Sequence, residues 1–247
     1  MDERDGHSGG SADSLSVRLL SRIGGGLYLV IIVLGAIQEI GVRQSVVVEN
    51  EAASTASNLD RLESLWRMGI AAEFVLLSCA VGLAVVLFVL LRPVNREVAL
   101  LAMVFNVVSL AIEGAAALYL VAAVIGVENG VAWQAFAIEL HGYGFAAALI
   151  FFGIECVLLG YLIFKSWFLP KALGALMAIA GACYLLNSYA MILAPDFAAG
   201  LLPAILIPPF VGEASLALWL LIRGIDPKKW ASAAASGRIT APAMDPS

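Results

Sequence analysis

Residues 143–164 read YGFAAALIFFGIECVLLGYLIF, an apolar run whose single charged residue is Glu155. A helix of about 20 apolar residues crosses the roughly 30 Å hydrocarbon core of a bilayer, so this run predicts a membrane-spanning helix. Its length favours a helix over the shorter, alternating strands of a membrane β-barrel. Because lipid offers no hydrogen bonds, the backbone must satisfy its polar groups internally, as a helix does.

Five further runs have the same character. The six expected spans cover about residues 19–40, 66–91, 98–126, 143–164, 172–194 and 201–222. The chain of 247 residues is 62% hydrophobic and 13% charged, whereas soluble domains are about 25% charged. The sequence therefore predicts an all-α polytopic membrane protein, a bundle of six transmembrane helices within residues 18–224. The polar, low-complexity ends, residues 1–17 and 225–247, are expected to be disordered tails.

The distribution of basic residues predicts the orientation in the membrane. With the N-terminus in the cytoplasm, eleven of the 14 Lys and Arg residues fall on the cytoplasmic side. The other three, Arg43, Arg61 and Arg67, fall outside. Cytoplasmic loops of membrane proteins carry an excess of Lys and Arg. Both termini are therefore expected in the cytoplasm.

Four acids lie inside the apolar runs without a basic residue to match them. They are Glu73, Glu113, Glu155 and Glu213. An ionisable group is costly in hydrocarbon, so such residues usually face a packed interior or a cavity. Glu155 and Glu213 each lie ten residues before the base that ends their helix, which places them about 15 Å deep, near the midplane. By the same rise per residue, Glu73 and Glu113 lie in the outer half.

Three more polar residues belong to the outer half: Glu39, His141 and Asn187. Glu39 is near a helix end and is expected to reach water. An interfacial histidine is more often structural than a ligand, and Asn187 is interpreted as an interhelical hydrogen-bond donor. The candidates for a ligand or proton pathway are Glu73, Glu113, His141, Glu155, Asn187 and Glu213. Each of the acids is equally compatible with a protonated carboxyl group that only holds helices together.

Other patterns predict packing rather than chemistry. Gly174, Ala178 and Ala182 form a row of small residues at four-residue spacing, which is typical of close helix packing. The prolines at positions 203, 208 and 209 are expected to break the sixth span near its outer end. The three cysteines lie in apolar runs and are interpreted as packing residues.

The motifs of several enzyme and binding classes are missing from the sequence. It has no His-Glu-x-x-His zinc motif, no glycine-rich phosphate loop and no Gly-x-Ser-x-Gly nucleophile elbow. No metal site is expected, and the sequence assigns no cofactor and no catalytic residue. No basic stripe with interleaved aromatic residues suggests nucleic acid binding. The expected partners are the lipid bilayer and a small apolar or cationic ligand, and the oligomeric state stays open.

Several stretches carry a resemblance to a known family. RIGGGLY (residues 22–28) opens the first span, LLRPVNR (90–96) closes the second, and LHGYGF (140–145) precedes the fourth. Together they resemble the bacterial integral-membrane family catalogued as domain of unknown function 4386, over about residues 18–224. The resemblance implies six spans in a bacterial inner membrane, and no activity. The family pattern has a histidine where this chain has Glu155, so a paired-histidine role is not expected here.

Three functions remain compatible with the sequence. The first is binding or carriage of a small molecule, a proton or a cation through the buried carboxyl groups. The second is a sensory or assembly module whose polar groups only fix helix packing. The third is a membrane-embedded enzyme that acts on a lipid-like substrate, with Glu73 and His141 as the acid and base.

Overall fold

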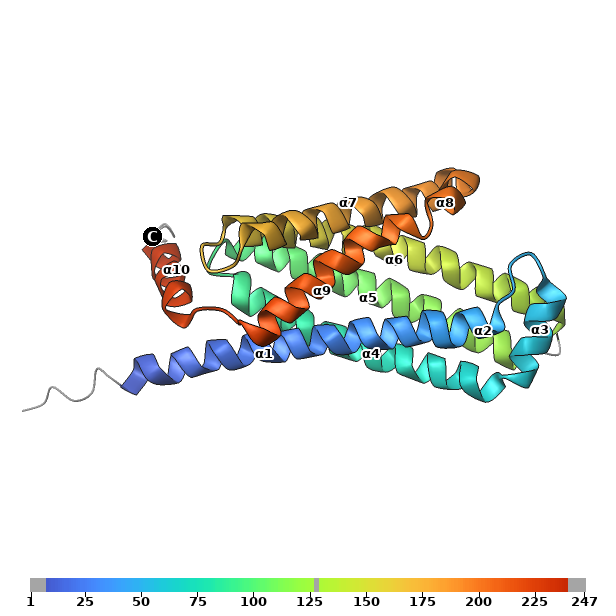
Figure 1. The fold of residues 1–247 in the computed structure, drawn as a ribbon. Coiled ribbons are helices and arrows are strands. Elements are labelled where there is room, and N and C mark those ends of the chain that lie inside the picture. Colours follow the sequence, from blue (N-terminus) through green and yellow to red (C-terminus); the bar gives the residue numbers. More distant parts are fainter. Residues whose placement is uncertain (1–7, 127–128, 240–247) are drawn as a thin grey trace, which may run out of the picture.

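The computed structural model describes residues 8–126 and 129–239, and these are helical throughout apart from short connections (Figure 1). Six helices are long and apolar enough to cross a membrane, as predicted. The long helices are α1 (Ser8–Ala36), α4 (Glu63–Leu91), α5 (Arg96–Ile125), α6 (Val131–Lys165), α7 (Lys171–Leu193) and α9 (Ile207–Ile222). Shorter elements are a π-helical segment (Ile37–Arg43), α2 (Gln44–Val46), α3 (Ala52–Arg61), α8 (Pro195–Leu201), a 3-10 turn (Ala204–Leu206) and α10 (Pro227–Ile239).

The six long helices form a closed ring. Each packs against the next in the chain, in the order α1, α4, α5, α6, α7 and α9, and α9 packs back against α1. Short connections make neighbours in sequence neighbours in space. The start of α1 and α10 lie at one end of the bundle, the termini end, and α3 lies at the other, the cap end (Figure 1).

Two apolar clusters fill the two ends of the ring. The larger includes Leu90, Leu162 and Leu220 at the termini end, and the smaller includes Val46 and Trp66 at the cap end. The Trp66 indole N–H also donates a hydrogen bond of 3.1 Å to the Leu120 carbonyl, which ties α4 to α5. The buried acids lie in a layer between the two clusters, whereas other buried polar residues, Ser21, Thr55, Gln134 and Ser166, lie nearer the ends of the bundle.

α6 and α7 approach each other closely, because glycines line their contact. A side chain at Gly160 would meet the backbone of Gly174 and Ala178 on α7. These two members of the predicted small-residue row lie at the contact as expected. The third, Ala182, is exposed, and its neighbour Gly181 lies against α6 instead.

The predicted tails differ from the structure. Residues 225–239 were expected to be disordered, but most of them form α10. The Trp230 indole N–H donates a hydrogen bond of 2.9 Å to the carbonyl of Leu90, and Ala233 is buried. These contacts with the termini end explain why a low-complexity segment is helical here. The first helix likewise begins at Ser8, inside the other predicted tail, whereas residues 1–7 and 240–247 lie outside the described part of the chain.

The observed starts of the fourth and sixth spans can also be compared with the predicted ones. α6 runs without a break from Val131 to Lys165, so the fourth span starts earlier than predicted. The proline-rich segment behaves as expected: a 3-10 turn follows Pro203, and α9 begins with Pro208 in its first turn. Proline is tolerated there because the first N–H groups of a helix have no partner within it.

Candidate functional site

The layer between the two apolar clusters contains polar side chains from all six long helices. We call them the interior polar group: Tyr28, Glu73, Asn106, Glu113, Glu155, Tyr184 and Glu213. Most of them are almost completely buried, and Glu113 and Tyr184 are partly buried. The four sequence-predicted acids therefore face protein rather than headgroups or solvent.

Glu213 on α9 lies between two tyrosines. The Tyr184 hydroxyl on α7 donates a hydrogen bond of 2.5 Å to the Glu213 carboxyl group. The hydroxyl of Tyr28 on α1 lies near the same carboxyl group. Glu213 thus lies where α1, α7 and α9 come together, and its hydrogen bond joins α7 to α9.

Glu155 on α6 is paired with an amide. The side-chain amide of Asn106 on α5 donates a hydrogen bond of 2.5 Å to the Glu155 carboxyl group. Asn106 also has a buried side-chain oxygen with no hydrogen-bond partner among the described residues. One helical turn further along α5, the Ser109 hydroxyl donates to the carbonyl of Ala148 at 2.8 Å. α5 therefore presents a polar face toward α6.

Glu73 on α4 and Glu113 on α5 form a carboxyl pair. Their side chains lie close enough to interact. An ionised carboxylate only accepts hydrogen bonds, and a protonated one can donate. The two carboxyl groups would join through a hydrogen bond when one of them holds a proton.

The separate pairs lie in the same part of the ring. Glu155 and Glu213 lie near enough to influence each other electrostatically, and so do Glu113 and Tyr184. The direct hydrogen bonds within the group are those of Asn106 with Glu155 and of Tyr184 with Glu213. The hydrogen bonds within the group join amide or phenol donors to carboxyl groups, and no Lys or Arg of the described residues takes part in them.

The structure does not join the other two candidates to this group. The His141 ring stacks on Phe145, and its Nδ1 is buried without a partner among the described residues. Asn187 is buried, and its side-chain oxygen likewise has no partner in that part of the chain. Within the same residues no hydrogen bond connects Glu73 to His141, the contact that the enzyme hypothesis requires. Glu39 lies on the outside in an ion pair with Arg43, with 3.7 Å between the charged groups.

The metal-ligating residues do not gather at one point. Among residues 8–126 and 129–239, no group of three or more His, Cys, Asp or Glu side chains is placed to hold a metal ion. A divalent cation bound in protein takes several oxygen ligands, usually including more than one carboxylate. The interior polar group is better suited to bind protons, because carboxyl groups and phenols can both donate and accept hydrogen bonds.

Comparison with known proteins places this group within a family domain. The family model described as "Domain of unknown function (DUF4386)" matches residues 23–224. The chain belongs to this family. The matched region holds every member of the interior polar group and all six candidate residues.

One relative shares a large part of the sequence. The chain is similar to an "Uncharacterized protein" from Archaeoglobus fulgidus, with 34% identity over 151 residues. The alignment covers 61% of this chain and 80% of the relative. No solved structure matches the chain. The family domain and the apolar helices together define a multi-pass membrane protein.

Sequence reasoning missed the tyrosines and Asn106 as members of the group. Tyrosine is usual at membrane interfaces, so Tyr28 and Tyr184 gave no signal of a role at mid-depth. A signal for Asn106 was present: Asn106, Ser109 and Glu113 are spaced by three and four residues, which places them on one face of α5.

Proposed function

We propose that this membrane protein binds protons in the interior polar group and carries them across the bilayer. The observation that supports this most strongly is the burial of Glu155 and Glu213, whose carboxyl groups accept hydrogen bonds from Asn106 and Tyr184 and from no basic residue. A buried carboxyl group without a basic partner is a candidate to hold a proton away from water. Ionisable residues inside spans often form the proton relays of pumps and transporters.

The side chains of the interior polar group are of the types that pass protons on, which supports a proton relay. A relay needs groups that accept a proton on one side and donate one on the other. Carboxyl groups and phenols meet this requirement, and the Tyr184 hydroxyl is hydrogen-bonded to the Glu213 carboxyl group. Because all six long helices contribute to the group, a change in its protonation would act on the packing of the whole ring.

The two apolar clusters define what a transport cycle would require. They lie toward the two ends of the ring, and the larger one includes Tyr28 itself. Apolar side chains in these positions would limit the access of water in a closed state of the carrier. Carriage would then need the ring to open at one end at a time, as in alternating access.

The proposal includes a location. The excess of Lys and Arg at the termini end supports an orientation with both ends of the chain in the cytoplasm. The family resemblance supports the inner membrane of a bacterial cell.

Reconstituted vesicles test proton carriage directly. The purified chain is placed in vesicles that contain a pH-sensitive dye, and a potassium diffusion potential drives proton entry. We expect acidification that is lost in Glu213→Gln and in Glu113→Gln. Glu39→Gln is the matched control, because Glu39 is exposed and lies outside the group, and it should retain the flux. Vesicles with the unmodified chain that acidify no faster than empty ones would exclude the proposal.

A structural role is the second candidate, and one observation favours it. Glu155 and Glu213 each accept a 2.5 Å hydrogen bond from a neighbouring helix, as carboxyl groups that only fix helix packing would. The same variants distinguish the two. If Glu213→Gln lowers the unfolding temperature while vesicles of the unmodified chain show no flux, the group serves assembly. Loss of flux in a variant of normal stability supports proton carriage.

A further inference from the structure

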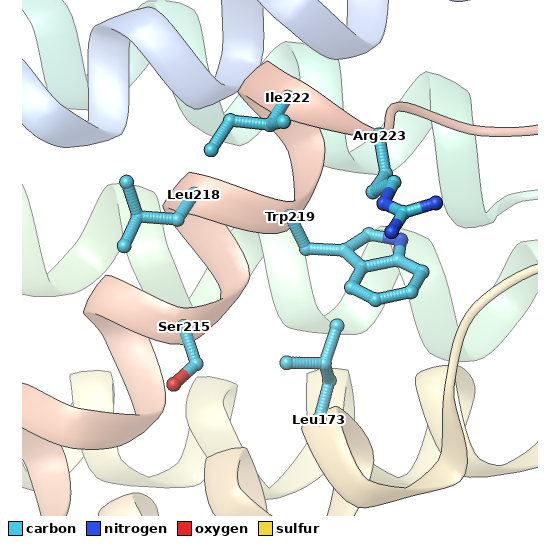
Figure 2. Close-up of a pocket in the computed structure, with 6 residues that line it drawn as sticks. All are labelled: Leu173, Ser215, Leu218, Trp219, Ile222 and Arg223. Carbon is cyan, nitrogen blue, oxygen red and sulfur yellow. The ribbon is translucent and has the colours of Figure 1, made fainter.

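A groove of about 320 Å³ lies between α7 and α9 near the termini end (Figure 2). Its lining residues are Leu173, Ser215, Leu218, Trp219, Ile222 and Arg223. Leu173 lies in the first turn of α7, the other residues lie in the second half of α9 or directly after it, and Leu218 and Ile222 are exposed on the outer surface of the bundle. It shares no residue with the interior polar group.

The groove has an apolar wall along most of its length. Leu218 and Ile222 are 44% and 66% exposed, although both belong to a span. Ser215, Trp219 and Arg223 are spaced by four residues and lie on one face of α9. This face extends for about 12 Å along the helix axis. A lipid acyl chain would fit along such a wall.

The termini end of the groove presents hydrogen-bond donors without an acceptor. The Trp219 indole N–H is buried and has no hydrogen-bond partner in the described part of the chain. Arg223 forms no ion pair with any described residue, and its side chain lies beside the indole ring (Figure 2). Indole and guanidinium groups can only donate hydrogen bonds. A ligand that satisfies both must bring an acceptor, and a negative charge matches Arg223.

We propose that this groove binds an anionic phospholipid. Its phosphate accepts hydrogen bonds from Arg223 and from the Trp219 indole, and an acyl chain lies against Leu173, Leu218 and Ile222. Basic pockets between spanning helices are a known way to recognise acidic headgroups. A soluble anion would match the donors, but it would leave the apolar wall without a partner.

Native mass spectrometry of the intact chain tests the proposal. The detergent-solubilised protein is mixed with phosphatidylglycerol or phosphatidylcholine that carry the same acyl chains. We expect retention of phosphatidylglycerol over phosphatidylcholine, and loss of this preference in Arg223→Gln. The matched control is Arg96→Gln, an exposed arginine at the same end of the bundle but on α5, and it should keep the preference. Equal retention of both lipids by the unmodified chain, or an unchanged preference in Arg223→Gln, would overturn the proposal.

Two further measurements keep the test decisive if Arg223→Gln fails to fold. Trp219→Phe removes only the indole donor and should weaken the preference without abolishing it. A phosphatidylglycerol with a photoreactive acyl chain should crosslink to the peptide that contains Leu218 and Ile222. Crosslinks confined to other helices would contradict the assignment. Displacement of the lipid by millimolar inorganic phosphate would instead identify a site for a free anion.

Discussion

Tyr184 and Glu213 are joined by a hydrogen bond of 2.5 Å that links α7 to α9 inside the ring. Tyr184→Phe removes the donor but keeps the aromatic ring. The buried carboxyl group then loses its partner on α7, and an unsatisfied buried polar group costs about 1–3 kcal/mol. We expect the free energy of unfolding in detergent to fall by about that amount.

The control for this measurement lies on the same helix. Tyr189 on α7 is 49% exposed, so Tyr189→Phe removes a hydroxyl group from the lipid-facing surface. Its stability should remain close to that of the unmodified chain. Equal stability of Tyr184→Phe and Tyr189→Phe would show that the hydrogen bond between Tyr184 and Glu213 contributes little to the free energy of unfolding.

The carboxyl pair predicts the reactivity of the chain toward a hydrophobic carbodiimide. This reagent modifies carboxyl groups that hold a proton in apolar surroundings. Two neighbouring carboxyl groups tend to share one proton, and Glu73 and Glu113 are neighbours of this kind. We therefore expect labelling of one member at neutral pH, as shown by mass spectrometry of peptides. Glu113→Gln should remove or redirect the label.

Exposed acids provide the contrast. Glu39 and Glu63 form ion pairs with Arg43 and Arg67 on the outer surface of the helices. They should remain unmodified under the same conditions. Labelling of these two residues with none at the pair would argue against a retained proton.

Hydropathy alone located the six spans, because a helix in lipid needs apolar side chains and therefore appears in the sequence as a long apolar run. It also placed Glu73, Glu113, Glu155 and Glu213 inside the protein, since the cost of a lipid-exposed charge excludes the alternative. The sequence does not predict that Glu73 and Glu113 lie beside each other. Which residues meet depends on the rotation and tilt of each helix, and packing against neighbours sets both.

The C-terminal helix shows a second limit. An alanine- and serine-rich segment reads as a flexible tail when its own composition is considered. What orders it is the tertiary hydrogen bond from Trp230 to the Leu90 carbonyl, 140 residues away in sequence. No local pattern specifies that contact.

The close contact between α6 and α7 predicts that a small substitution at Gly160 lowers the stability of the protein. A Cβ atom at Gly160 would lie 2.7 Å from Ala178 N and from Gly174 O on α7. Backbone atoms cannot move aside as a flexible side chain can, so Gly160→Ala should push the helices apart. Overpacking of this kind costs about 1–3 kcal/mol, measurable as a lower unfolding temperature in detergent.

A glycine without close neighbours serves as the control. At Gly26 in α1, an added Cβ atom would meet nothing within 4 Å. Gly26→Ala should be neutral or stabilise the helix by about 0.5–1 kcal/mol, because alanine loses less backbone entropy. A similar loss of stability in both variants would indicate that the close approach of α6 and α7 does not cause the loss of stability in Gly160→Ala.

The orientation of the ring can be tested with single cysteines. Cys79, Cys156 and Cys183 are free thiols and are first replaced by alanine. Ser57 in α3 and Lys229 in α10 are both exposed, at opposite ends of the bundle. Because basic residues gather at the termini end, we expect that end to face the cytoplasm. A membrane-impermeant maleimide should therefore label Ser57→Cys on intact spheroplasts and reach Lys229→Cys only after permeabilisation. The reverse pattern would place the Lys- and Arg-rich end outside and contradict the orientation.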